Sequence, residues 1–200
     1  MATIELVSPV VIAEPPPATR QLAPRRALGI DTRLTLIDNG KPRARDLLLL
    51  IAAELQRCIG LTRIRVISKE SASRVIDDAE AADIAATSDA VIAGLGDCGA
   101  CSACSLADAI RMEQAGVPST VLISDVFGAH VASFAATLGM PGYHSAAVPH
   151  PVSSKSDLQL ARFAAAVAPR IAEQLAGASA SGGRTHTQTP RGTPAAAVPT

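Results

Sequence analysis

Strand-like and helix-like segments alternate along most of this chain, and this alternation constrains its fold more than any other feature. Short runs rich in Val, Ile and Leu predict strands at 34–37, 63–67, 90–95, 119–123 and 145–148. Helical patterns follow them at 42–59, 74–86, about 98–115, 124–139 and 157–175. The strand-like runs are apolar without strict alternation, which is typical of parallel strands buried on both faces. We expect an α/β fold: a doubly wound, flavodoxin-like or Rossmann-like three-layer sandwich around a mostly parallel sheet of about five strands.

The two ends of the chain lack this pattern. Residues 1–27 contain three consecutive prolines and several arginines, and we expect them to form a flexible, solvated N-terminal arm. Residues 177–200 are rich in Ser, Gly, Thr, Pro and Ala without periodicity, and we expect a disordered C-terminal tail. The folded unit is therefore expected at residues 28–176, as one domain.

Composition excludes several classes of partner. Lysine plus arginine and aspartate plus glutamate both number 18, and aromatic residues make up only 2% of the chain. A basic surface for nucleic acid or membrane is therefore not expected, nor are aromatic platforms for stacking bases. The longest apolar run, residues 47–53, is far shorter than the roughly 20 residues of a membrane span. The chain starts without a basic leader segment, and we expect a cytoplasmic protein.

Three of the four cysteines are clustered immediately after the third expected strand. Cys98, Cys101 and Cys104 follow one another at three-residue intervals, where a helix is expected to begin. Backbone N–H groups and the helix dipole stabilise a thiolate at such a position. Cys98 and Cys101 have the Cys-x-x-Cys spacing of thiol oxidoreductases, so Cys101 could resolve an adduct or sulfenate on Cys98. In a cytoplasmic protein the cluster indicates redox chemistry or metal binding rather than structural disulfides.

The redox hypothesis requires no cofactor, but two other interpretations stay open. The three cysteines are similar to part of an iron–sulfur ligand run, and Asp97, His144 or His150 could complete a zinc site with them. Alternatively, the cysteines are small buried side chains with no chemical role.

Candidate binding residues follow the carboxyl ends of the first two expected strands, which is where such sheets bind ligands. Asp38, Asn39 and Lys41 occupy a strand-to-helix turn whose N–H groups and ammonium could hold a carboxylate or phosphate. Lys69 and Arg74 follow the second strand and are candidate anchors for a substrate carboxylate. Arg74 is expected in the first turn of a helix, where a cation is unfavourable.

Two more candidate segments follow the fourth and fifth strands. Ser124 and Asp125 are expected to begin a helix, so either of them could be an N-cap or could face the thiols. His150 lies between Pro149 and Pro151, which restrict its backbone, and its imidazole could transfer protons or pair with a thiolate.

The stretch Gly94-Leu95-Gly96-Asp97-Cys98-Gly99-Ala100-Cys101 and the residues that follow it resemble the signature of the UGSC-motif (seleno)protein family. That family is related to the selenoprotein B component of glycine, sarcosine and betaine reductases. The resemblance spans about residues 34–151 and implies that Cys98 occupies the selenocysteine or cysteine position. Cys101 then matches the fourth motif position, and Ala100 stands where the motif has Ser. The resemblance implies nucleophilic attack on an activated carbon and reductive cleavage of a carbon–heteroatom bond.

We therefore expect a thiol-dependent enzyme that acts on a small, anionic substrate. Cys98 would attack the substrate, Cys101 would resolve the adduct, and His150 or Asp125 would move protons, with Cys104 in the same motif. A thioredoxin-like partner could restore the dithiol. The first alternative is a hydrolase or lyase centred on zinc or an iron–sulfur cluster at the cysteines. The second is a non-catalytic subunit that forms a homo- or hetero-oligomer with a related subunit.

Overall fold

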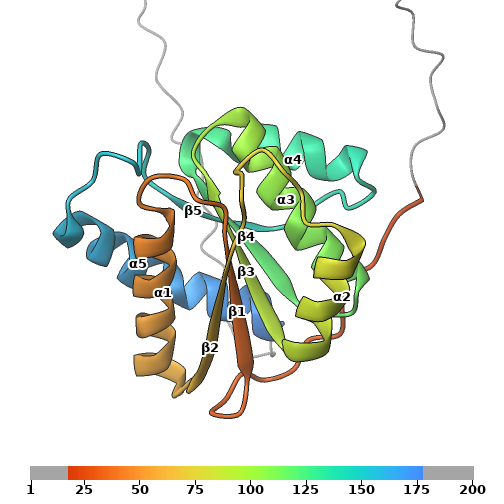
Figure 1. The fold of residues 1–200 in the computed structure, drawn as a ribbon, viewed down its shortest axis with the longest axis horizontal. Helices are drawn as coiled ribbons and strands as arrows, with labels where there is room; N and C mark the ends of the chain where they lie inside the picture. Colours follow the sequence, from red (N-terminus) through yellow and green to blue (C-terminus); the bar gives the residue numbers. More distant parts are fainter. Residues whose placement is uncertain (1–17, 178–200) are drawn as a thin grey trace, which may run out of the picture.

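The computed structural model describes residues 18–177 and confirms the expected α/β class. Its five-stranded sheet is parallel throughout, with strand order β2-β1-β3-β4-β5 (Figure 1). The strands are β1 Arg33–Asp38, β2 Arg63–Ser68, β3 Ala90–Gly96, β4 Ser119–Ser124 and β5 Ser145–Val148. The helices are α1 Ala44–Ile59, α2 Asp78–Thr87, α3 Gly99–Gln114, α4 Gly128–Thr137 and α5 Asp157–Ala176, with a short 3₁₀ helix η1 at Asp125–Phe127.

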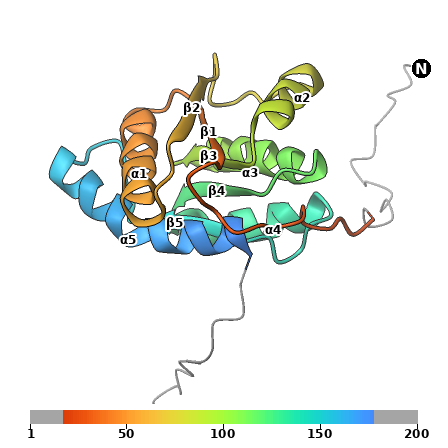
Figure 2. The ribbon, with the colours of Figure 1, turned by 90° about the horizontal axis from the view of Figure 1, so that it is seen from below.

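The sheet lies between two helical layers. Helices α1 and α5 cover one face, and α2, α3 and α4 cover the other (Figure 2). Leu34 and Leu36 of β1 face the first layer, while Ile37 faces the second. Every residue of β3 and β4 is buried. This two-sided burial explains why the strands read as continuous apolar runs in the sequence.

The direction in which the chain winds through the sheet reverses between β1 and β3. After β1 the chain crosses to α1 on one face, and after β3 it enters α3 on the other. The loops at the carboxyl ends of this strand pair therefore diverge, which is the usual ligand position in doubly wound sheets. The side-chain amide of Asn39, in the loop after β1, bridges this gap by donating to the Leu95 carbonyl of β3 at 2.9 Å and to Ser105 Oγ of α3 at 3.1 Å.

Gly96 allows α3 to begin directly against the sheet. A Cβ atom at this position would lie 2.7 Å from Ser102 Oγ and 2.9 Å from Ile123 Cγ2. Any larger residue would therefore push the first turn of α3 away from β4. Gly99, by contrast, has no heavy atom within 4 Å of an added Cβ. Of these two motif glycines, only Gly96 is required by close packing.

The helix expected at 74–86 begins later, at Asp78. Asp77 is its N-cap: the Asp77 side chain accepts the Glu80 N–H, and the Glu80 side chain accepts the Asp77 N–H. This capping box fixes the start of the helix, so the placement of Arg74 in a first helical turn is wrong. Arg74 lies in the loop that connects β2 to α2.

The expectation of a solvated arm is wrong for residues 18–27, because this segment packs on the domain. Ala23 is buried, and its N–H donates to Glu113 Oε2 at 2.7 Å. The Arg25 guanidinium donates to both Glu113 oxygens at 2.6 Å. Sequence could not show this contact, since Glu113 lies on α3, far along the chain. Residues 1–17, and residues 178–200 of the expected tail, lie outside the described residues.

The Arg25–Glu113 ion pair predicts a stability effect. Arg25→Ala should lower the free energy of unfolding by about 3 kcal/mol, because the Glu113 side chain is 0% exposed and would keep a buried charge without its cation. Arg26→Ala is the matched control, since Arg26 is exposed, and should change stability by less than about 0.5 kcal/mol. Urea unfolding of both variants measures the difference. Equal, small effects would contradict a structural role for residues 18–27.

Between residues 18 and 177, none of the helices has the length and apolarity needed to cross a lipid bilayer.

Candidate thiol active site

Cys98 is the N-cap of α3. Its backbone is extended, with φ −158° and ψ 167°, and its sulfur accepts the Cys101 backbone N–H at 3.3 Å. The Ser102 hydroxyl donates to the Cys98 carbonyl at 2.7 Å and fixes the same turn. The sulfur of a half-buried cysteine therefore occupies the place that a Ser or Asp oxygen usually takes at a helix start. A thiolate there is stabilised by the N–H group and by the helix dipole.

Lys41 supplies a positive charge to this thiol pair. Burial alone would raise the pKa of Cys98, but hydrogen bonds from the Cys101 side chain and backbone, together with the Lys41 ammonium, hold it below the ordinary value. Reciprocally, a hydrogen bond to Cys101, and a weaker one to Cys98, raises the pKa of Lys41. Asn39 places this lysine, because its side-chain oxygen accepts the Lys41 N–H at 3.2 Å.

The thiol pKa is raised, not lowered, in the other two motif cysteines. Burial and the neighbouring Cys98 raise the pKa of Cys101, which is itself buried. Burial also raises the pKa of Cys104, on the next turn of α3. Of the three motif thiols, Cys98 at the helix start is the one whose pKa is lowered, so it ionises most readily.

Alkylation rates test this order of thiol acidity. Cys98 should react with iodoacetamide at neutral pH faster than Cys101 and Cys104, and faster than Cys58, which is exposed on α1. Lys41→Met should slow Cys98 because the lost cation raises the thiol pKa, and the difference should vanish at alkaline pH, where every thiol ionises. Mass mapping of the labelled peptides gives the rates. Labelling of Cys58 first would count against this site.

A polar cluster is built from the carboxyl ends of β3, β4 and β5. His150 Nδ1 lies 3.0 Å from Asp97 Oδ1 and 3.0 Å from Ser124 Oγ. The His150 backbone N–H donates to Asp125 Oδ1 at 3.2 Å, and the imidazole packs edge-on against the Phe127 ring. The structure therefore brings His150, Ser124 and Asp125 together, on the β4 side of Asp97 and Cys98.

The remaining predicted residues have mainly structural contacts. Asp38 is buried and accepts the Gly40 N–H and the Ser68 hydroxyl, both at 3.0 Å. Asn39 is also buried and connects its loop to β3 and α3. Lys41 is the member of this turn that reaches the thiols.

Lys69 and Arg74 are both engaged in ion pairs. The Lys69 ammonium, 1% exposed, is 2.5 Å from Asp108 Oδ2, so it lies beneath the surface rather than facing a substrate. Arg74 forms a two-pronged pair with Glu80 at 2.7 and 2.5 Å and lowers the pKa of that carboxyl to about 2. Neither side chain is placed as the free carboxylate anchor that the sequence suggested.

The structure places two further residues, Asp97 and His130, at this site. Asp97, considered only as a possible zinc ligand, is the carboxylate partner of His150. Its position at a strand end, directly before the motif cysteine, was the available signal. His130 on α4 places Nε2 3.2 Å from the Gly99 carbonyl, at the first residue of α3. No local pattern indicated that α4 would contact this turn.

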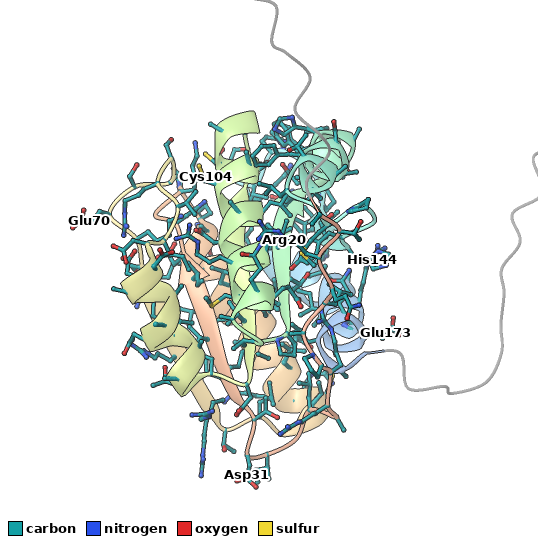
Figure 3. All side chains as sticks on the ribbon, turned by 90° about the vertical axis from the view of Figure 1, so that its right-hand side faces the viewer. Arg20, Asp31, Glu70, Cys104, His144 and Glu173 are labelled. Atoms are coloured by element: carbon teal, nitrogen blue, oxygen red, sulfur yellow. The ribbon has the colours of Figure 1, made fainter. Side chains whose placement is uncertain are left out.

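The metal alternative gains no geometric support in residues 18–177: no three His, Cys, Asp or Glu side chains converge there as a possible ion site. His144 precedes β5, whereas the cysteines follow β3. Because the strands are parallel, these positions lie at opposite ends of the strands. Figure 3 shows His144 well away from Cys104.

A cavity of about 390 Å³ lies at the end of the molecule opposite the cysteine motif. Its lining includes Arg26, Asp31, Asp89 and Pro118, which precede β1, β3 and β4 or lie at their amino ends. Asp31 and Cys104 are at opposite ends of the molecule in Figure 3. This cavity is therefore separate from the cysteine site.

Fold and site together define an α/β domain of the doubly wound class whose cysteine motif caps the helix after its central strand. The sequence model of the UGSC family matches residues 5–177, and the chain belongs to that family. The match begins within the expected arm and so includes residues 18–27, which pack on the domain. Neither the curated proteins nor the solved structures contain a significant match to this chain.

Proposed function

We propose that this protein is a thiol-dependent enzyme that cleaves a carbon–heteroatom bond reductively in a small, anionic substrate. The observation that carries the proposal is the Cys98 sulfur at the N-cap of α3, with the Cys101 N–H and the Lys41 ammonium beside it. These contacts lower the pKa of Cys98 and so favour its thiolate, which is the nucleophilic form of cysteine.

The chemistry balances with the two thiols of the motif. The Cys98 thiolate attacks the activated carbon, a sulfur–carbon bond forms, and the heteroatom leaves with a proton. The Cys101 thiolate then attacks Cys98 Sγ, a disulfide forms, and the electron pair of the sulfur–carbon bond returns to carbon, which takes a proton. The substrate is reduced by two electrons and the dithiol is oxidised by two. An external dithiol of the thioredoxin kind restores both cysteines.

Lys41 and His150 have separate roles in this scheme. Lys41 lowers the pKa of Cys98 before the attack and is close enough to Cys101 to stabilise its thiolate for the second step. His150, about one-third exposed and held by Asp97, accepts a proton as the thiols ionise and supplies the protons that the leaving group and the product carbon take up.

The substrate class rests on the relation of the UGSC family to selenoprotein B of the glycine, sarcosine and betaine reductases. Those reductases imply a carboxylate whose neighbouring carbon carries an amine-type leaving group. A carboxylate or carbonyl beside the reacting carbon also stabilises the negative charge that the second step places there. The cytoplasm, which keeps thiols reduced, suits a catalytic dithiol.

Thiol counting with product analysis tests the proposal. Fully reduced protein is mixed anaerobically with small carboxylates that carry an amino, ammonium or halide group on the adjacent carbon. A substrate should consume two thiols for each molecule of reduced product, and the disulfide should map to Cys98 and Cys101. Thiol loss without reduced product, or product without thiol loss, would contradict the mechanism. Metal analysis of the same anaerobic sample addresses the zinc and iron–sulfur alternative.

A further inference from the structure

The contacts around His150 determine which of its ring nitrogens carries the proton. Nδ1 faces two oxygens, Asp97 Oδ1 and Ser124 Oγ, each at 3.0 Å. The Asp97 carboxylate is 8% exposed and can only accept hydrogen bonds when ionised. A bare lone pair on Nδ1 would face that negative oxygen, so the arrangement is favourable only when Nδ1 carries hydrogen.

Ser124 agrees with this assignment. Its hydroxyl is within 3.3 Å of the Gly96 carbonyl, to which it donates, so its lone pairs are turned toward His150 Nδ1. Ser124 is fully buried and shares Nδ1 with Asp97. In a serine triad the hydroxyl and the carboxylate contact different ring nitrogens, so Ser124 is not an activated nucleophile here.

We propose that Asp97 is a positioning residue that holds neutral His150 as the Nδ1–H tautomer and leaves Nε2 as the proton-accepting atom of the site. The Val152 N–H holds Asp97 in turn, at 3.3 and 3.2 Å from its two oxygens. The carboxylate directly precedes Cys98, so one loop carries both the thiol and the group that orients the histidine. The role of Nε2 as a base rests on the proposed function, whereas the tautomer does not.

Histidine ¹⁵N NMR tests the tautomer directly. In reduced full-length protein at about pH 9, His150 should show a protonated Nδ1 and an unprotonated Nε2. Asp97→Ala should make Nε2–H the main form, because the acceptor is gone. Ser124→Ala, the matched control, should retain Nδ1–H, since Asp97 remains. An Nε2–H form in the wild-type protein, or Nδ1–H retained in Asp97→Ala, would overturn the proposal.

If Asp97→Ala does not fold, Asp97→Asn takes its place, and the Nδ1–H fraction should then fall because an amide is the weaker acceptor. With a substrate in hand, kcat/KM of the folded variant should decrease by about 10²- to 10⁴-fold, while the alkylation rate of Cys98 stays within about threefold of wild type. Unchanged kcat/KM would remove Asp97 from the proton-transfer machinery. Failure of the thiol-consumption experiment would overturn the proposed function and leave the tautomer result standing.

Discussion

Cys98→Ser should abolish turnover, with a loss of at least about 10³-fold, because the thiolate forms the covalent bond to the substrate. Cys101→Ser should instead accumulate a covalent adduct on Cys98, since the attack that releases it is lost. Cys104→Ser should be the mildest of the three, because Cys104 lies a full turn beyond Cys101 and burial raises its thiol pKa. Intact mass and product formation, measured on all three variants, establish this graded order.

The same three variants distinguish the redox mechanism from a metal centre. If the cysteines held zinc or an iron–sulfur cluster, each substitution would remove one ligand, and activity and bound metal would fall together in all three. Equal losses accompanied by metal release would therefore reject the dithiol mechanism. Cys58→Ser is the matched control, because Cys58 is exposed near the end of α1 and away from the motif, and it should behave as wild type.

Lys69→Met should have the largest effect on stability, lowering the free energy of unfolding by about 3–5 kcal/mol near neutral pH. Lys69 and Asp108 are each only 1% exposed, and Asp108 also accepts the Ile76 N–H at 2.8 Å. Without the ammonium, Asp108 keeps an uncompensated charge in the interior. Urea unfolding measures the loss, and a change below about 1 kcal/mol would contradict a stabilising role for the pair.

The stability lost in Lys69→Met should depend on pH, with a smaller loss at lower pH. Burial raises the pKa of Asp108, and the hydrogen bond from Lys69 opposes it, so removal of Lys69 raises the folded-state pKa further. A carboxyl whose pKa is raised by folding binds its proton more tightly in the folded state. The stability deficit of Lys69→Met relative to wild type therefore shrinks as pH falls. The variant should be closer to wild type at about pH 5 than at about pH 7. The double variant Lys69→Met with Asp108→Leu should recover most of the stability at both pH values.

The prediction of the fold succeeded because strand and helix periodicity are local properties. The apolar runs before Asp38 and Cys98 are each buried on both faces, and that burial is what removed their alternation. The start of α2 was missed because two patterns competed there: continued helical periodicity from Arg74, and the capping box at Asp77, which fixes the boundary.

The sequence also located the candidate thiol site, because a cysteine directly after a buried strand needs only the neighbouring backbone to reach a helix N-cap. It suggested Lys41 as a residue of this site as well, since the loops after two adjacent parallel strands lie side by side at the carboxyl ends of those strands. It could not show that the Lys41 ammonium would act on both Cys98 and Cys101, which depends on how the Asn39 amide holds the loop after β1 against β3 and α3.

The chain by itself therefore determined the layered fold, the position of the cysteine motif at a helix start, and the edge of the sheet where candidate residues gather. Only the tertiary structure decided which charged groups are partners: Glu113 with Arg25, Asp108 with Lys69, and Asp97 with His150. Periodicity and capping act over a few neighbouring residues, so they can be read along the chain. Partner choice depends on how distant elements pack, and the cost of burying an unpaired charge selects among partners only once they are brought together.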